Sequence, residues 1–71
     1  MKNIGELKKA IAEKKPLKWN DPDPIKGNDY TITYVEPLED FDDDEIDIPI
    51  LIQYGGGSEA EVFVSEILTK N

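Results

Sequence analysis

The chain contains 71 residues, carries a net charge of −8 and has neither cysteine nor histidine. This length fits one small domain, and the missing residue types exclude disulfides, thiolate zinc sites and the usual general base of neutral-pH catalysis. All eight basic residues are lysine, and the absence of arginine argues against direct nucleic-acid binding. The longest apolar run has three residues, far short of a membrane span, so we expect a cytoplasmic protein without membrane contact.

The charges are divided unevenly along the chain. Residues 1–20 contain six Lys and two Glu, for a net charge of +4, whereas residues 21–71 contain two Lys and fourteen acidic residues, for −12. Two interpretations stay open. The charges could keep the protein in solution and attract a basic helix to an acidic sheet, or the acidic part could be a surface for a basic partner.

An amphipathic helix over about 3–15 is the first predicted element. Three apolar residues recur at helical spacing and would cover one face of a sheet, namely Ile4, Leu7 and Ile11. Asn3 can cap the first turn. Pro16 is expected to stop the helix after Lys15.

A short extended stretch follows, in which Leu17 and Trp19 share one face. It is a candidate for an additional short strand. Trp19 precedes a turn sequence rich in Asn, Asp and Pro, Asn20–Pro24. A tryptophan beside a rigid loop can anchor a protein interface, although in a small domain it more often belongs to the core.

A second turn signal, Lys26–Asp29, leads into a predicted strand over 30–35. Two aromatic and four β-branched residues occur in this stretch of six, which is typical of a strand. Strict alternation would place Tyr30, Ile32 and Tyr34 on one face of the sheet.

The segment 36–47 holds eight acidic residues and no basic one, and we predict an acidic loop there. Apolar residues interrupt it, and Leu38 or Phe41 is expected to attach it to the core. Asp40, Asp42 and Asp44 alternate as at the start of an EF-hand loop. The match then fails, because Glu45 stands where that loop needs Gly.

Two strands are predicted in the C-terminal part, over 48–54 and over 60–67. In the first, Ile48, Ile50, Ile52 and Tyr54 alternate on one face. A glycine triplet then provides a hairpin connection. Residues 59–68 also fit a helix with a capping box, but the β-branched run near their centre favours a strand paired with 48–54.

These elements predict an α+β fold with one N-terminal helix packed on a small antiparallel sheet. The sheet would have three strands, or four if Leu17–Trp19 is included. A single short helix has too little apolar surface to cover a second face. Some aromatic side chains are therefore expected to be partly exposed.

The residue inventory argues against an enzyme. Paired carboxylates could support glycosidase chemistry, but that chemistry needs a deep cleft, which so short a chain rarely builds. The glycine triplet lacks the spacing of phosphate-binding loops. We therefore predict no catalytic, metal-binding or cofactor-binding residues.

The acidic loop, with its interleaved apolar residues, is the best candidate for function. It predicts a non-catalytic protein-interaction domain that binds a basic protein partner. A DNA-mimic inhibitor of a nucleic-acid-binding protein is one alternative, and a structural or weak divalent-cation-binding accessory protein is another. The sequence indicates no oligomeric state. The predicted partner-binding residues are Asp40, Phe41, Asp42, Asp43, Asp44, Glu45, Trp19 and Tyr54.

Overall fold

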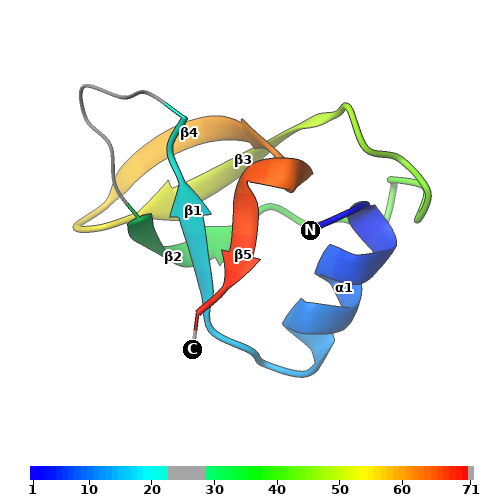
Figure 1. Cartoon of the computed structure of the whole chain (residues 1–71), viewed down its shortest axis with the longest axis horizontal. Helices are drawn as coiled ribbons and strands as arrows, with labels where there is room; N and C mark the ends of the chain where they lie inside the picture. Colours follow the sequence, from blue (N-terminus) through cyan, green and yellow to red (C-terminus); the bar gives the residue numbers. More distant parts are fainter. Residues whose placement is uncertain (23–28, 71) are drawn as a thin grey trace.

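The computed structural model describes residues 1–22 and 29–70, and within them a curled antiparallel sheet of five strands lies beside one α-helix (Figure 1). The elements in chain order are α1 (Ile4–Ala12), β1 (Leu17–Asn20), β2 (Asp29–Val35), β3 (Pro49–Tyr54), β4 (Ser58–Phe63), the 3-10 helix η1 (Val64–Glu66) and β5 (Ile67–Thr69). The strand order is β4-β3-β2-β1-β5. The predicted α+β class is confirmed, and the sheet has more strands than predicted.

Helix α1 ends earlier than its sequence suggests. It stops at Ala12, because Lys14 adopts a left-handed conformation with φ of 58°. The amide of Lys14 donates to the carbonyl of Ile11 at 3.0 Å, and the amide of Lys15 donates to that of Ala10 at 3.0 Å. These two bonds form a Schellman motif, which turns the chain before Pro16 is reached.

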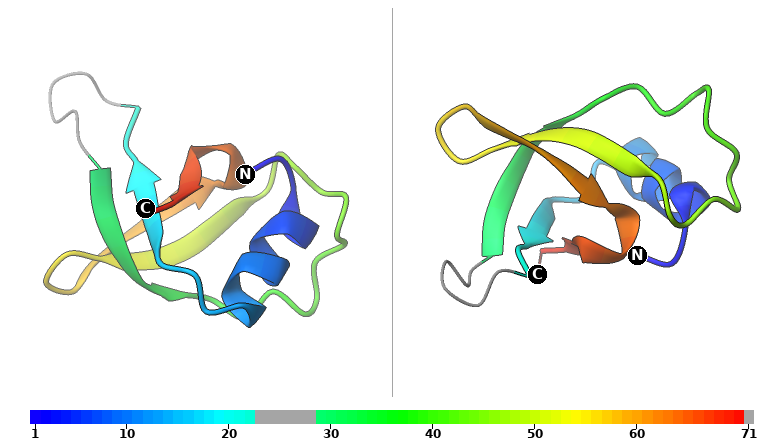
Figure 2. Two further views of the ribbon diagram at one scale, coloured as in Figure 1. Left: turned by 60° about the horizontal axis from the view of Figure 1, so that its bottom comes forward. Right: turned by 90° about the horizontal axis from the view of Figure 1, so that it is seen from above.

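The core fills the concave side of the curled sheet, against α1 (Figure 2). The inward face of β3 is confirmed, since Ile50 and Ile52 are fully buried. Helix α1 contributes Ile4, Leu7 and Ala10 to the core, whereas Ile11 is 40% exposed. The prediction that Ile11 covers the sheet is therefore wrong, although Ile11 has the helical spacing of a core residue.

A β-bulge changes the face pattern of β2. Ile32 pairs with Tyr54 of β3, but Tyr34 pairs with the next residue along, Gln53, so Thr33 is an extra residue. The alternation shifts by one position after Thr33. Val35 therefore packs against the core, and Tyr34 points outward with 46% of its surface exposed. The predicted common face of Tyr30, Ile32 and Tyr34 is wrong for this reason.

The C-terminal segment forms two strands instead of the single strand predicted over 60–67. Val62 and Val64 are both buried, and in a straight strand Ile67 would lie on the opposite face from them. The turn of η1 changes the direction of the chain, so that Ile67 is also fully buried. Strand β5 then pairs with β1, where Ile67 lies opposite Trp19.

Strand β1 confirms the additional strand at Leu17–Trp19, and it lies between β2 and β5. The predicted turns at Asn20–Pro24 and Lys26–Asp29 fall largely in residues 23–28, outside the described residues. In the described part of the chain, no helix is long and apolar enough to cross a membrane.

Candidate functional site

The acidic segment, residues 36–47, runs along one side of α1 (Figures 1 and 2). Backbone hydrogen bonds hold it there. The amide of Ile4 donates to the carbonyl of Glu45 at 3.0 Å, and the amide of Gly5 donates to the carbonyl of Asp43 at 2.8 Å. The first amides of a helix have no partner within the helix, so the segment satisfies two of them. Its negative charge also lies at the positive end of the helix dipole.

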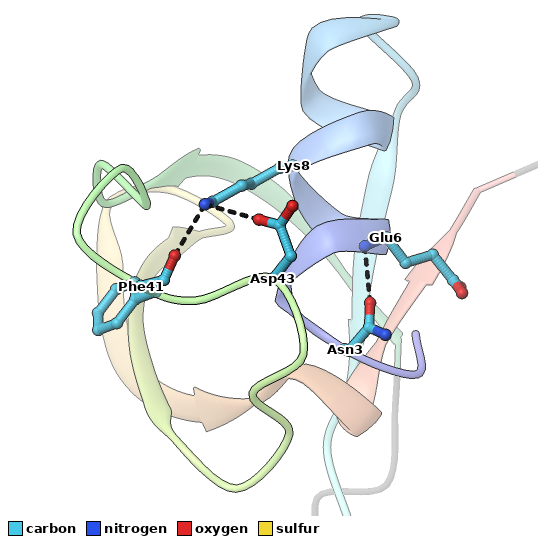
Figure 3. Close-up of polar contacts among 5 residues, drawn as sticks. All are labelled: Asn3, Glu6, Lys8, Phe41 and Asp43. Atoms are coloured by element: carbon cyan, nitrogen blue, oxygen red, sulfur yellow. Dashed lines mark hydrogen bonds and ion pairs between the residues drawn. The ribbon is translucent and has the colours of Figure 1, made fainter.

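Side chains complete this attachment (Figure 3). The ammonium group of Lys8 donates to the carbonyl of Phe41 at 2.8 Å and to Oδ1 of Asp43 at 2.9 Å. Asn3 accepts from the amide of Glu6 at 2.9 Å, as the capping prediction required. The basic helix is therefore in direct contact with several residues of the acidic segment.

Gly5 allows the close approach of the segment to the helix. A Cβ atom at this position would lie 3.0 Å from Cβ of Asp43 and 3.2 Å from its carbonyl oxygen. Both distances are too short for ordinary packing. A glycine inside a helix lowers helix stability, and here the close contact explains its presence.

Leu38 attaches the other end of the acidic segment to the core, where it is 6% exposed. The amide of Phe41 donates to the carbonyl of Leu38 at 3.0 Å, and Phe41 itself packs partly against the core. The expected apolar attachment is confirmed for Leu38. The segment has neither helix nor strand, as predicted, but it is fixed at several points.

A groove runs between α1 and the beginning of the acidic segment, and we call it the α1 groove. Its volume is about 510 Å³, and it is open to solvent. Its apolar lining consists of Ile11, Ala12, Val35, Pro37 and Leu38. Ile11 is exposed because the groove, rather than a strand, lies opposite it. Three charged residues border this lining, namely Lys8, Glu36 and Glu39.

The predicted acidic site residues follow the groove wall in the chain, and they differ in accessibility. Asp40, Asp42, Asp43 and Asp44 are exposed. Glu45 is half-buried, and its Oε2 atom is buried without a hydrogen-bond partner among the described residues. Glu45 is therefore a poor candidate for contact with a partner.

Trp19 and Tyr54 form a separate group with Tyr30, and we call these three residues the aromatic cluster. Their ring centroids lie 4.9–5.6 Å apart. Trp19 is 8% exposed, and its indole N–H donates to Oε1 of Glu66 at 2.9 Å. The structure thus places Trp19 in the core, with its polar atom already satisfied. Tyr30 and Tyr54 are half-buried.

Sequence reasoning missed the groove residues Ile11, Val35 and Pro37. Ile11 has the spacing of a core residue, and Val35 reaches its place only through the bulge at Thr33. Gly5 was a signal of the contact between the helix and the acidic segment, since a glycine inside a helical pattern lowers helix stability, but it does not indicate the groove residues.

Comparison with protein families, curated proteins and solved structures finds no match for this chain. In the described residues, no group of three or more acidic side chains is arranged to hold a metal ion. The functional argument therefore rests on the groove and the charges around it.

Proposed function

We propose that this protein is a non-catalytic interaction domain that binds a segment of a partner protein in the α1 groove. One observation carries the proposal. An open apolar groove, lined by the exposed side chain of Ile11, continues directly into a segment with eight acidic residues. The partner segment that fits this surface has a large apolar residue next to basic ones. The cytoplasmic location expected from the sequence remains a prediction.

The apolar groove would mainly set the dissociation rate of the partner, and the acidic residues would mainly set its association rate. Burial of one large apolar side chain contributes roughly 1.5–3 kcal/mol, which would slow dissociation. The exposed acids, including Asp42 and Asp44, would attract a basic partner over a longer distance and raise the association rate.

The anchoring of the acidic segment supports this assignment. The amide of Glu36 donates to the carbonyl of Leu51 at 3.0 Å, and this bond and the burial of Leu38 hold one wall of the groove in place before any partner arrives. Binding then costs little additional ordering of the wall.

Selection from a random-peptide phage library would test the proposal. We expect enriched peptides to contain a large apolar residue beside Lys or Arg. The Ile11→Gln variant should bind them about tenfold more weakly, a loss of about 1.4 kcal/mol. Leu68→Gln is the matched control, because Leu68 is 39% exposed and lies outside the groove lining. The proposal fails if no peptide is enriched, or if Ile11→Gln binds as tightly as the wild type.

Association kinetics of a selected peptide would test the role of the acids. Replacing Asp42 and Asp44 together by Asn should slow association several-fold at low salt, with little change in dissociation. The difference should shrink at high salt because of screening. The control replaces Glu59 and Glu61 of β4 by Gln, which removes the same charge elsewhere. Equal association rates for both double variants would contradict a local role of the acidic segment.

A further inference from the structure

A second hollow, of about 250 Å³, adjoins the α1 groove on the other side of Ile11 and Val35. These two residues line both hollows, so the two spaces meet over them. Tyr34 lines the second hollow, because the bulge at Thr33 turns it away from the core. The apolar surface therefore continues along β2 and α1 beyond the groove already described.

The two ends of this continuous groove carry opposite charges. Lys14 and Lys15 border the second hollow, whereas Glu36 and Glu39 border the first. Lys8 also borders the first hollow, but its charge is paired with Asp43 at 2.9 Å. The Schellman motif, with Lys14 in the left-handed conformation, fixes the position of the basic end. The continuous groove is therefore acidic at one end, apolar over Ile11 and Val35 in the middle, and basic at the other end.

The individual charges at each end are not equally available. Oε2 of Glu36 accepts from the amide of Leu51 at 2.5 Å, which leaves Glu39 as the outward acid. Lys15 pairs with Glu13 at 3.1 Å. Lys14 is exposed and makes no ion pair with the residues that the structure describes. Glu39 and Lys14 are therefore the charges best placed to meet a partner.

We propose that the two hollows form one polar-ended groove that binds a short partner segment in a fixed orientation. This inference rests on the proposed function and adds the charge pattern of the partner. The segment has a basic residue at the Glu39 end, apolar residues over Ile11 and Val35, and an acidic residue at the Lys14 end.

Electrostatics makes the opposite orientation unfavourable. Reversal would replace two attractive contacts by two repulsive ones, and juxtaposed like charges reduce affinity. A second copy of this chain is a poor occupant, since each copy carries a net charge of −8 and the copies repel one another.

The test uses two labelled synthetic peptides and fluorescence anisotropy. The bipolar peptide is Lys-Lys-Leu-Ala-Leu-Glu-Glu, and the basic peptide is Lys-Lys-Leu-Ala-Leu-Lys-Lys. For each protein, we take the affinity for the bipolar peptide divided by the affinity for the basic peptide. This ratio should be about tenfold higher for the wild type than for the double variant Lys14→Glu and Lys15→Glu. The control, Lys2→Glu with Lys70→Glu, makes the same change in net charge outside the groove and should leave the preference unchanged.

The orientation itself is read by NMR with a nitroxide at the basic end of the bipolar peptide. The amide signals of Leu38 and Glu39 should broaden more strongly than those of Lys14 and Lys15. Equal broadening at both ends, or a preference that the Lys14 and Lys15 changes do not alter, would overturn the fixed orientation. If library peptides still bind and depend on Ile11 in that case, the proposed function stands and only this inference fails.

Discussion

The acidic segment lies beside α1, at the opposite end of the molecule from the β3–β4 hairpin, whose first strand ends at Tyr54 of the aromatic cluster (Figures 1 and 2). The acidic segment is polar in sequence, yet backbone bonds and Leu38 fix it to the body. Trp19 and Tyr54 of the aromatic cluster were predicted to bind a partner, yet Trp19 is buried and hydrogen-bonded. Residue type alone therefore does not identify the accessible surface.

The two regions differ in accessibility because their polar and apolar groups find different partners within the protein. In the aromatic cluster, three rings pack on one another and Glu66 pairs with the indole of Trp19, so little remains for a partner. In the acidic segment, the backbone is satisfied by α1, while most carboxylates and the neighbouring apolar groove stay open to solvent. The better candidate for a binding site is therefore the region whose apolar and charged groups stay exposed to solvent, and not the region with the more unusual composition.

The largest expected effect concerns Trp19. Trp19→Ala removes a buried ring and leaves a cavity, so the free energy of unfolding should fall by about 3–5 kcal/mol. Urea denaturation followed by circular dichroism measures this. Tyr34→Ala, at an exposed position on the same sheet, should cost about 1 kcal/mol or less. A Trp19→Ala protein of normal stability would show that the aromatic cluster is a surface and not a core.

An intermediate effect is expected at Gly5. Gly5→Ala improves helix propensity by about 1 kcal/mol, but the new Cβ meets Asp43 at 3.0 Å. We expect a net destabilisation of about 1 kcal/mol, because overpacking of a fixed contact outweighs the propensity gain. Faster hydrogen exchange of the residue 5 amide should accompany it.

Gly56→Ala is the matched control for Gly5→Ala. A Cβ at Gly56 would have no atom within 4 Å, and Gly56 lacks a positive φ. This change should leave stability equal or slightly higher. If Gly5→Ala were as harmless as Gly56→Ala, the acidic segment would not be held closely against the helix.

The smallest effect is expected at Lys8. Lys8→Met keeps the length of the side chain and removes its bonds to Phe41 and Asp43. Since this ion pair is largely exposed, stability should fall by about 0.5 kcal/mol. Lys2→Met serves as the control. A loss as large as that expected for Trp19→Ala would mean that the ion pair, and not the backbone bonds, fixes the acidic segment.

Much of the fold followed from local patterns. Spacing predicted the start of α1 and the inward direction of Leu7, and alternation predicted the buried face of β3 with Ile50 and Ile52. The acidic segment could be recognised as a loop because repelling carboxylates favour neither a helix nor a strand. The candidate site was predicted only in its acidic residues, since the groove depends on residues that look like ordinary core positions.

The sequence by itself determined the α+β class, the helix, the strands at the centre of the sheet and the charge division, because these depend on neighbours along the chain. Only the tertiary structure decided the bulge at Thr33, the turn at η1, the burial of Trp19 and the exposure of Ile11. The periodicity of a sequence predicts which side of a helix or strand is apolar. Residues distant in the chain decide whether a strand or an open groove lies opposite that side. A local pattern therefore cannot predict it.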